Sequence, residues 1–256
     1  MIGAIAGDMI GSPYEHEPIK TVAFPTVVAD FTDDTVFSIA VADAILRGMN
    51  YGASIQAFAR QYPNLPCGGS FRHWIWDPNR IPYYSYGNGS AMRVSPVGFA
   101  FESIDRVLDE ARQTAVVSHN HPEGIIGAQA TALAVFLARK GEDKTAIRIK
   151  LEKCFAYDLD RCLDEIRPAY TFEVTSQGSV PESIIAFLES RDYESAIRNA
   201  VSLGGDADTM ACIVGGIAQA YYEKVPDKII AQVCEKLPVV LMAVVDRFVD
   251  QFNCPY

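Results

Sequence analysis

The chain has 256 residues, of which 49% are hydrophobic and 21% are charged, and its formal net charge is −10. This length allows one large domain or two small ones, and the hydrophobic share is enough for a sizeable core. An acidic chain is poorly suited to a nucleic-acid backbone as its main partner. A phosphorylated small molecule is not excluded, because metal ions and backbone amides can supply positive potential locally.

The cysteines and the apolar runs bear on the cellular compartment. The six cysteines form no C-x-x-C pair and suit no zinc module, so we expect reduced thiols, with Cys212 packed inside an apolar helix. The apolar N-terminus lacks a basic region and is interrupted by Asp8, unlike a signal peptide. The apolar run at 237–245 is too short to span a bilayer. We expect a cytoplasmic protein without a membrane partner, and we favour a monomer.

Helical periodicity recurs through most of the chain. A short first helix precedes a loop that holds Glu15, and β-like pieces at 20–31 stay an open alternative. Apolar residues spaced at i, i+3 and i+4 then predict a series of packed helices. Their predicted ranges are 33–48, 101–117, 122–139, 181–190, 193–203, 206–223 and 238–252. Gly48 is a stop signal, and Pro-Glu pairs open the helices at 122 and 181.

Segment 61–99 differs in kind from the helical pattern. It is rich in Gly, Pro, Tyr and Trp, and we predict long irregular stretches there. A loop of that length in a compact domain is usually functional. No linker, repeat or low-complexity tract divides the chain. The sequence therefore predicts an all-α fold, one compact helical domain over residues 1–256, with its site built from loops and helix starts.

Two acidic clusters stand before predicted apolar helices. They are Thr32-Asp33-Asp34-Thr35 and, after a pair of glycines, Asp206-Ala207-Asp208-Thr209. Carboxylates beside threonine hydroxyls are hard oxygen ligands that suit magnesium or manganese. The helix behind the second cluster is apolar on all sides, and carboxylates at the start of a buried helix are costly unless they are paired, hydrogen-bonded or metal-bound. The pair of clusters therefore indicates a metal site at helix N-termini.

Other interpretations of the clusters exist. Aspartate and threonine are good helix caps, so either cluster alone is equally well explained as a cap. Phosphotransferases with an aspartate nucleophile carry D-x-D-x-[TV] directly after a strand, whereas the segment before Asp206 is predicted to be helical. Prenyl-chain synthases use D-D-x-x-D, and Asp33-Asp34 lacks a third carboxylate at that spacing. Both enzyme classes fit worse than a metal site shared by the two clusters.

Further candidate residues lie outside the clusters. The backbone amides of the glycine-punctuated segment 86–93 can cradle a diphosphate, although a β-turn at Asn88-Gly89 is an alternative. The i, i+2 spacing of His119 and His121 disfavours a zinc site and suggests that one is structural and one reaches a ligand. The tyrosines at 83, 84 and 86 either stack on a base or pack the long loop. Asp8 is a candidate helix cap.

Taken in order, these pieces resemble the ADP-ribosylglycohydrolase family, the family of dinitrogenase-reductase-activating glycohydrolase and the ADP-ribosyl-acceptor hydrolases. The match spans nearly the whole chain, and the glycine segment between two acidic clusters is its most specific part. The matching residues are Gly3, Gly7-Asp8, Gly11, Tyr14-Glu15, Thr32-Asp33-Asp34-Thr35, Gly68-Gly69, Phe71, Trp74, Gly87-Asn88-Gly89, Ala91-Met92-Arg93, Pro96, Ser118-His119 and Gly204-Gly205-Asp206-Ala207-Asp208-Thr209.

The resemblance implies an all-α fold of the ADP-ribosylglycohydrolase type with two Mg²⁺ or Mn²⁺ ions. By analogy, Thr32, Asp33, Asp34 and Asp208 would ligate one ion, and Asp206, Asp208 and Thr209 the other, with Asp208 bridging. Glu15 matches a mobile glutamate that gates the site in some members. Asn88, Gly89, Ser90 and Met92 would lie against the diphosphate and the distal ribose, and His119 near the phosphates or ribose.

The implied activity is hydrolysis at the anomeric carbon of the distal ribose, which releases ADP-ribose from an acceptor. We expect Glu15, Asp33 and Asp208 to be the catalytic carboxylates, with Asp33 or Asp208 as the base. The region before Gly68 is shorter than in the family, so the acceptor stays open among arginine, serine, a base or a small conjugate. The alternatives are a non-catalytic ADP-ribose-binding relative and a metal-dependent phosphohydrolase of a nucleoside diphosphate compound.

Overall fold

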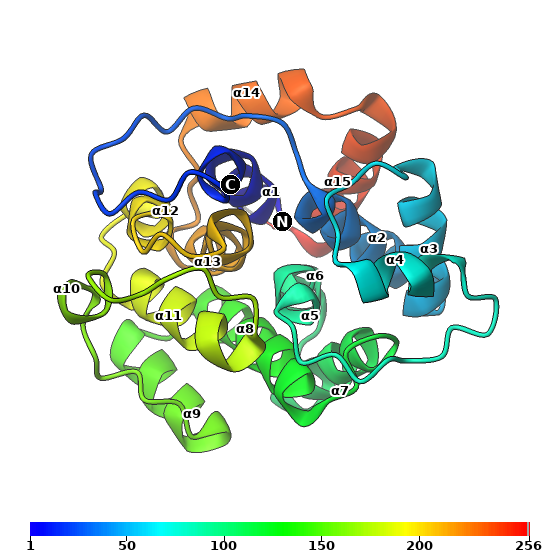
Figure 1. The fold of residues 1–256 in the computed structure, drawn as a ribbon, viewed down its shortest axis with the longest axis horizontal. Helices are drawn as coiled ribbons and strands as arrows, with labels where there is room; N and C mark the ends of the chain where they lie inside the picture. The colour runs from blue at the N-terminus through cyan, green and yellow to red at the C-terminus, as the bar shows by residue number, and fades with distance from the viewer. Residues whose placement is uncertain (255) are drawn as a thin grey trace.

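A computed structural model of the chain describes residues 1–254 and 256, and it is built from helices joined by irregular segments (Figure 1). In chain order they are α1 (Ile2–Gly11), the 3₁₀ helix η1 (Ser12–Tyr14), α2 (Asp33–Arg47), α3 (Tyr51–Gln61), α4 (Gly69–Trp76), α5 (Gly89–Met92), α6 (Ser95–Ala100), α7 (Ile104–Val116), α8 (Pro122–Arg139), α9 (Lys144–Phe155), α10 (Leu163–Ile166), α11 (Ser176–Leu188), α12 (Tyr193–Val201), α13 (Ala207–Tyr222), α14 (Asp227–Lys236) and α15 (Val239–Phe252). No strand occurs among the described residues, which confirms the all-α prediction.

Helix α13 lies at the centre of the molecule, as Figure 1 shows, with α1 beside it and α8, α11 and α12 around it. Every residue of α1 is buried, and so is α13 from Ala207 to Ala220. A helix that is apolar on every side must be surrounded by other helices to be stable in water. The remaining helices supply that surrounding layer, and α2, α3 and α4 form a group on the other side of α1 and α5.

Helices α1 and α13 touch backbone to backbone. A Cβ atom added at Gly7 would lie 2.0 Å from the carbonyl oxygen of Ala211, and one added at Gly11 would lie 2.4 Å from that of Ala207. At the far end, a Cβ atom at Gly215 would lie 2.1 Å from the carbonyl oxygen of Gly3. Glycine at every fourth position of α1 therefore brings the two helix axes as close as backbone atoms allow.

Several helices have starts that are fixed by a polar side chain at the N-cap. Thr32, Asn50, Ser103, Asp143, Thr175 and Asp192 each accept a hydrogen bond from a backbone amide in the first turn of the helix that follows. Such a cap satisfies one of the amides that a helix start leaves unpaired. Gly48 ends α2 in the left-handed conformation, with φ of 62°, which confirms the predicted stop signal.

The predicted helices at 33–48, 101–117, 122–139, 193–203, 206–223 and 238–252 are confirmed, with small differences at their ends. The helix predicted at 181–190 was placed wrongly, because α11 begins at Ser176 and contains Pro181 in its interior. The Thr175 side chain caps it through the Gly178 amide, so the Pro-Glu pair is not its start. Cys212 lies buried inside α13 as predicted, and all six cysteines are unpaired.

Two irregular regions also differ from expectation. Segment 61–99 is not one long loop, because it contains α4, α5 and α6, which are too short to show apolar periodicity. The open alternative of strands at 20–31 is wrong, since this segment is extended but pairs with no other strand. It is held by α1 and α12 instead, through the Ala29 amide on the Met9 carbonyl (2.7 Å) and Arg198 on the Val22 carbonyl (2.8 Å).

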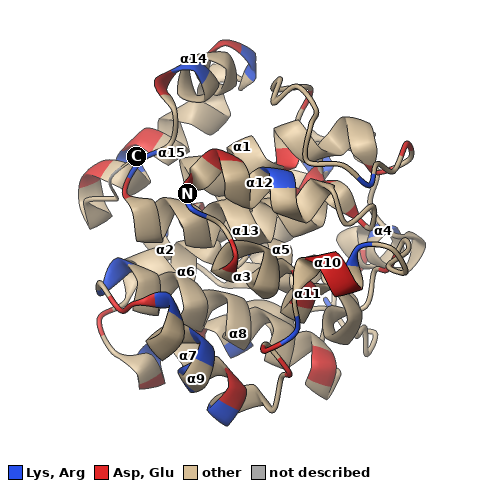
Figure 2. Ribbon diagram, turned by 90° about the vertical axis from the view of Figure 1, so that its left-hand side faces the viewer, with Lys and Arg blue, Asp and Glu red and all other residues tan. Residues whose placement is uncertain are grey.

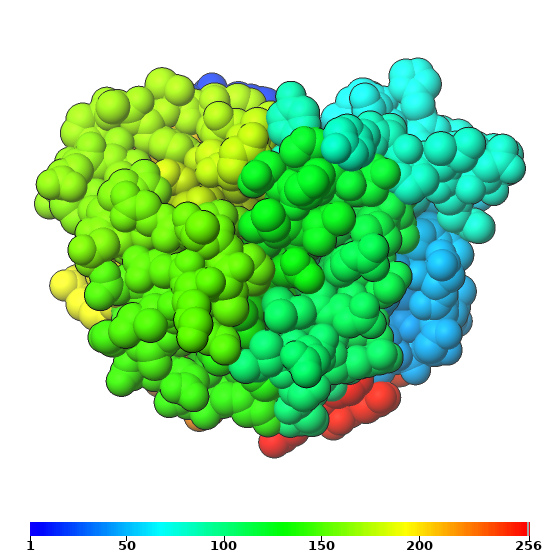
Figure 3. Space-filling view, turned by 90° about the horizontal axis from the view of Figure 1, so that it is seen from below, coloured from blue at the N-terminus to red at the C-terminus, as the bar shows by residue number. Residues whose placement is uncertain are grey.

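The outer helices carry the charge. Figure 2 shows acidic and basic residues as bands on peripheral helices such as α7, α9 and α14. In Figure 3 the side chains of α7, α8 and α9, drawn in green, form much of the face seen from below, with the cyan part of the chain at its edge. Within the described part of the chain, no helix has both the length and the apolar character needed to cross a bilayer.

The close contact between α1 and α13 can be tested by a substitution at Gly7. We expect Gly7→Ala to lower the free energy of unfolding by roughly 3 kcal/mol, because the added methyl group meets a backbone carbonyl that cannot move without separating the helices. Urea denaturation followed by circular dichroism measures the change. Gly69→Ala is the matched control, since a Cβ atom there has no neighbour within 4 Å. It should change the free energy of unfolding by only a few tenths of a kcal/mol. Equal stability of the two variants would contradict the tight contact.

Candidate active site

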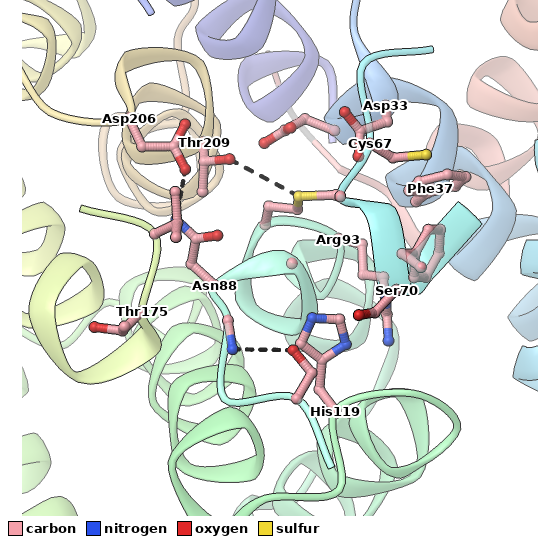
Figure 4. A pocket seen from close by; sticks show the side chains of 18 of the residues that line it. Asp33, Phe37, Cys67, Ser70, Asn88, Arg93, His119, Thr175, Asp206 and Thr209 are labelled. Carbon is pink, nitrogen blue, oxygen red and sulfur yellow. Dashed lines mark hydrogen bonds between the residues drawn. The ribbon is translucent and has the colours of Figure 1, made fainter. Parts of the chain in front are cut away.

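A cavity of about 620 Å³ opens where the starts of α2 and α13 meet the loops around residues 67–71, 83–89 and 174–175. Figure 4 shows side chains from these segments pointing toward the same space. Carboxylates from both acidic clusters line one end, and the glycine segment and His119 line the other. Residues that are far apart in the chain are therefore brought to one site.

Asp8 connects the central helix pair to the first acidic cluster. It is fully buried in the middle of α1 and therefore does not cap that helix, but as a candidate cap it bonds to amides at the start of α2 instead. Its carboxylate accepts hydrogen bonds from the amides of Thr32 (3.0 Å) and Thr35 (3.1 Å) and from both threonine hydroxyls. A side chain on α1 thus fixes the N-terminus of α2.

The first cluster lies at this anchored helix start. The Thr32 hydroxyl caps α2 by accepting from the Asp34 amide, as the capping interpretation predicts for that residue. Asp34 is buried, and its Oδ1 atom has no hydrogen-bond partner in the protein. Asp33 is half-buried and lines the cavity. An unpartnered buried carboxylate oxygen is costly, and a bound cation would satisfy it.

The second cluster lies at the start of α13. Gly204 adopts φ of 66°, a left-handed turn that glycine makes without strain, and Asp206 follows at the N-cap position. The Asp206 carboxylate accepts a hydrogen bond from Asn88 Nδ2 at 2.8 Å, shown dashed in Figure 4. Asp208 is buried in the first turn and accepts from the Thr209 amide at 2.9 Å. The second cluster is therefore tied to the glycine segment.

Two groups of carboxylates have the geometry of cation sites. Asp8, Asp34 and Asp208 form one group, and Glu15, Asp206 and Asp208 form the other. Within each group, one oxygen from every residue lies within 4.8 Å of the others. Hard divalent cations take oxygen ligands of this kind, and Asp208 belongs to both groups. The residues present therefore fit a pair of Mg²⁺ or Mn²⁺ ions that share one aspartate.

The carboxylates raise one another's pKa. Burial raises the pKa of Asp34 and Asp208, and the negative charges of their aspartate neighbours raise it further. For Asp33, burial first and then Asp8 and Asp206 raise the pKa to about 8. Burial and Asp206 also raise the pKa of Glu15, against the opposite effect of His16. Without added positive charge the cluster therefore holds protons at neutral pH.

The glycine segment is fastened to the loop before α11. The Asn88 amide donates to the Val174 carbonyl (2.9 Å), and the Ser176 hydroxyl donates to the Gly87 carbonyl (2.8 Å). Gly89 begins the short helix α5, and a Cβ atom there would lie 3.0 Å from His119 Nε2. A larger residue at 89 would crowd the imidazole. Glycine at this position therefore lets the backbone come close to His119.

Hydrogen bonds from Arg93 to Ser118 and between Ser118 and His119 bear on which ring nitrogen of His119 carries the proton. An Arg93 nitrogen donates to the Ser118 hydroxyl (2.9 Å), and that oxygen lies 2.8 Å from His119 Nδ1. Because the guanidinium can only donate, the serine hydrogen is free to point at Nδ1. We infer that Nδ1 accepts this hydrogen, which places the ring proton on Nε2, over the glycine segment. Burial and Arg93 hold the pKa of His119 well below its usual value, so the ring is a neutral donor.

Arg93 is fully buried beside the cavity. Only one of its nitrogens is hydrogen-bonded, to Ser118 and to the Thr114 carbonyl, while Nε and Nη1 have no partner. Burial lowers its pKa to about 10, while Tyr83 and Asp33 act in the opposite direction. The side chain therefore stays charged at neutral pH, with the Phe71 ring 6.0 Å from it. It supplies positive charge behind an otherwise acidic site.

The structure brings most of the predicted site residues together. Those that line the cavity are Glu15, Asp33, Asp34, Asn88, Gly89, Met92, His119, Asp206, Asp208 and Thr209. Thr32 lies just behind them, bonded to Asp8. Ser90 points away from the cavity, since its hydroxyl donates to the Gly124 carbonyl (2.7 Å). Met92 Sδ lies 3.9 Å from the Thr209 hydroxyl.

Asp8 and Arg93 were not predicted as site residues, although both stand in the motifs that carry the resemblance. For Asp8, the available signal is one carboxylate in the middle of an apolar helix with glycine at positions 3, 7 and 11. A buried acid in such a helix needs partners, and those partners lie on α2. Nothing in the sequence marks Arg93 as buried.

Comparison with known proteins identifies the architecture. A family model described as ADP-ribosylglycohydrolase matches residues 1–255. The chain belongs to the ADP-ribosylglycohydrolase family. Its place among these glycohydrolases makes it an enzyme and confirms the resemblance noted in its motifs.

Relatives of this ADP-ribosylglycohydrolase-family chain match over most of their length. ADP-ribosylhydrolase ARH3 of Homo sapiens is 26% identical over 316 residues, covering 89% of this chain and 86% of the human protein. ADP-ribosylarginine hydrolase Tri1 of Pseudomonas putida is 25% identical, and the match covers 87% of this chain and 69% of that protein. A solved structure titled ADP-ribosylglycohydrolase-related protein complex aligns with a TM-score of 0.75 at 25% identity, covering 95% of this chain and 94% of that one.

The acidic cluster predicts how stability depends on pH and on metal. A folded-state pKa above the unfolded value means that the folded protein binds more protons, so its stability falls as pH rises. For Asp33 this loss runs from about pH 4 to about pH 8. With chelator present, we expect Asp33→Asn to make the melting temperature fall less steeply with pH. Added Mg²⁺ or Mn²⁺ should stabilise wild type more at pH 8 than at pH 5.

Thermal denaturation over this pH range measures both effects. Asp250→Asn is the control, because this exposed aspartate lies on α15, outside the cluster, and should leave the slope unchanged. A melting temperature whose pH slope is unaffected by Asp33→Asn, together with metal stabilisation independent of pH, would contradict the assigned electrostatics.

The hydrogen-bond chain to His119 makes a separate prediction. Long-range nitrogen–proton NMR should show the His119 ring protonated on Nε2 and neutral at neutral pH, because burial and Arg93 hold its pKa well below the usual value. Ser118→Ala removes the donor to Nδ1, so the Nδ1 tautomer should become populated. A wild-type ring protonated on Nδ1 would show that the chain of hydrogen bonds runs the other way.

Proposed function

We propose that this protein is a metal-dependent hydrolase that cleaves the glycosidic bond at the anomeric carbon of the distal ribose and releases ADP-ribose from an ADP-ribosylated acceptor. One observation carries the proposal: two carboxylate groups that share Asp208 lie at one end of a cavity whose other end offers the glycine segment and a neutral imidazole donor. The first end suits ribose hydroxyls with cations, and the second suits a diphosphate.

Two Mg²⁺ or Mn²⁺ ions are assigned to the two carboxylate groups. By the family resemblance, Asp206, Asp208 and Thr209 would hold one ion, and Thr32, Asp33, Asp34 and Asp208 the other. Glu15 lies close enough to Asp206 and Asp208 to join the first set. When bound, the ions would supply positive charge that orients the ribose hydroxyls and acidifies a water. Asp8 belongs to the first carboxylate group, but it is not among the ligands that the resemblance implies, and three of its four hydrogen bonds occupy Oδ2.

Asp33 is the better candidate for the general base. It lines the cavity and is half-buried, while Asp208 is buried, shared by both carboxylate groups and bonded to the Thr209 amide. A base must reach the water that attacks the anomeric carbon, and a shared ligand is less free to do so. We therefore assign proton removal to Asp33 and the bridging position to Asp208. Glu15, in a bend after η1, lines the cavity near Asp206 and Asp208.

The ADP-ribose would lie along the cavity with its diphosphate against Asn88, Gly89 and His119. The Nε2 proton of His119 faces this segment and can donate to a phosphate oxygen without adding positive charge. Asn88 joins the two ends, since its side chain holds Asp206 while its backbone belongs to the glycine segment. Ser90 fastens the segment through its hydrogen bond to the Gly124 carbonyl, and Met92 lines the cavity beside it. The acceptor would belong to an ADP-ribosylated protein or a small conjugate, and the name of the relative ADP-ribosylarginine hydrolase Tri1 makes arginine one candidate.

Assays on ADP-ribose conjugates test the proposal. Purified protein with Mg²⁺ or Mn²⁺ should release ADP-ribose from arginine-linked or serine-linked conjugates, and chelator should stop the release. Intact conjugate with tight ADP-ribose binding would favour a non-catalytic relative, against which the complete set of acidic ligands argues. AMP or phosphate as product would favour a phosphohydrolase. Either result would overturn the proposed reaction.

Two variants separate the base from the bridging ligand. Asp33→Asn should lower kcat by about 10²- to 10⁴-fold with metal affinity reduced far less, because it removes a proton acceptor. Asp208→Asn should abolish tight binding of both ions. Isothermal titration with Mn²⁺ and single-turnover rates provide the two readouts. If Asp33→Asn keeps full kcat, the assignment of the base is wrong.

A further inference from the structure

A second cavity lies between α3 and α4, beside the active site. Its volume is about 400 Å³, within the range of pockets that hold small ligands. Phe37 and Cys67 line both this groove and the active-site cavity, so the two spaces meet at these residues. We call it the α3–α4 groove, and its other walls come from Tyr62, Leu65, Arg72, His73, Ile75 and Trp76.

The groove meets the active site at the carboxylate end. Figure 4 shows Cys67 and Phe37 beside Asp33, on the opposite side of the pocket from Asn88 and Thr175. The Asp33 charge acts on the Cys67 thiol and contributes, after burial, to a raised pKa. If the diphosphate lies against Asn88, the reacting carbon lies near Asp33. The bonded acceptor then extends toward the groove, away from the nucleotide.

The walls of the groove are apolar and basic. Arg72 lines it, and its Nε and Nη2 atoms donate to the carbonyls of Cys67 (3.1 Å) and Leu65 (3.3 Å), which hold the guanidinium in place. Trp76 is 61% exposed, and the Arg60 guanidinium lies 5.4 Å from the centre of its ring. No carboxylate lines the groove among the described residues. The groove is therefore positively charged, although the chain as a whole has a net charge of −10.

We propose that the α3–α4 groove binds the acceptor side of the substrate, as a protein segment next to the ADP-ribosylated residue that carries apolar and acidic side chains. The inference rests on the proposed function and names the acceptor class that it leaves open. Apolar walls take an apolar neighbour of the modified residue, and Arg72 takes a carboxylate. Basic flanking residues would meet Arg72 and Arg60 and be repelled.

Two ADP-ribosylated peptides test the groove. They carry the same modified residue, flanked by leucine and aspartate in one and by glycine and lysine in the other. For wild type we expect kcat/KM to favour the acidic, apolar peptide roughly tenfold, the effect of one favourable charge contact with some apolar burial. Arg72→Glu should bring the ratio to one or reverse it, and Trp76→Ala should reduce it. The ratio within each variant cancels any general loss of activity.

Matched substitutions elsewhere serve as controls. Lys228→Glu makes the same charge change on α14, and Ile149→Ala removes an exposed apolar side chain on α9, both outside the groove. Both should keep the wild-type ratio. The modified amino acid without flanking residues separates the two claims. If wild type releases no ADP-ribose from it or from either peptide, the proposed function fails, and the groove proposal fails with it.

If release occurs but the peptide ratio is one, the groove proposal alone is overturned. A preference for a modified nucleic-acid base over both peptides would also overturn it. A tenfold preference that survives both Arg72→Glu and Trp76→Ala would place acceptor recognition on another surface.

Discussion

The close contact between α1 and α13 is the constraint on which the site depends. Glycines at positions 3, 7 and 11 let α1 lie against the backbone of α13, and that contact sets Asp8 beside Asp208 in the first turn of the partner helix. Asp8 in turn holds the start of α2 through Thr32 and Thr35. The two acidic clusters therefore meet through one buried carboxylate. Moving the helices apart would therefore separate the clusters.

The same arrangement concentrates negative charge where water is scarce. Burial and mutual repulsion raise the pKa of the clustered carboxylates, and the buried Arg93 is set back behind His119. Carboxylates placed this way are unfavourable for folding unless protons or cations compensate them. The unpartnered Asp34 oxygen is the clearest sign that the site is arranged for a cation. Stability and function are in this sense opposed, because the groups that would bind metal weaken the metal-free protein.

Much of this could be predicted from the sequence, and the reasons for success and failure are physical. Long helices such as α2 and α13 show clear apolar periodicity, and Gly48 and the threonine caps mark ends by local chemistry. The clusters were recognised because two like motifs precede apolar helices. Short helices α4 to α6 carry too few turns for a period, and Pro181 suggested a helix start that Thr175 had already provided. The role of Asp8 and the burial of Arg93 depend on contacts between distant segments, which no local pattern reveals.

The proposed active site depends most on two ions being held jointly by the two clusters. Anomalous diffraction from crystals grown with Mn²⁺ tests it most directly, because the metal is located without reference to activity. We predict two peaks, one near Asp34 and one near Asp206, with Asp208 within bonding distance of both and Asp8 bonded to the threonines of α2. A single peak, or none at saturating Mn²⁺, would contradict the account.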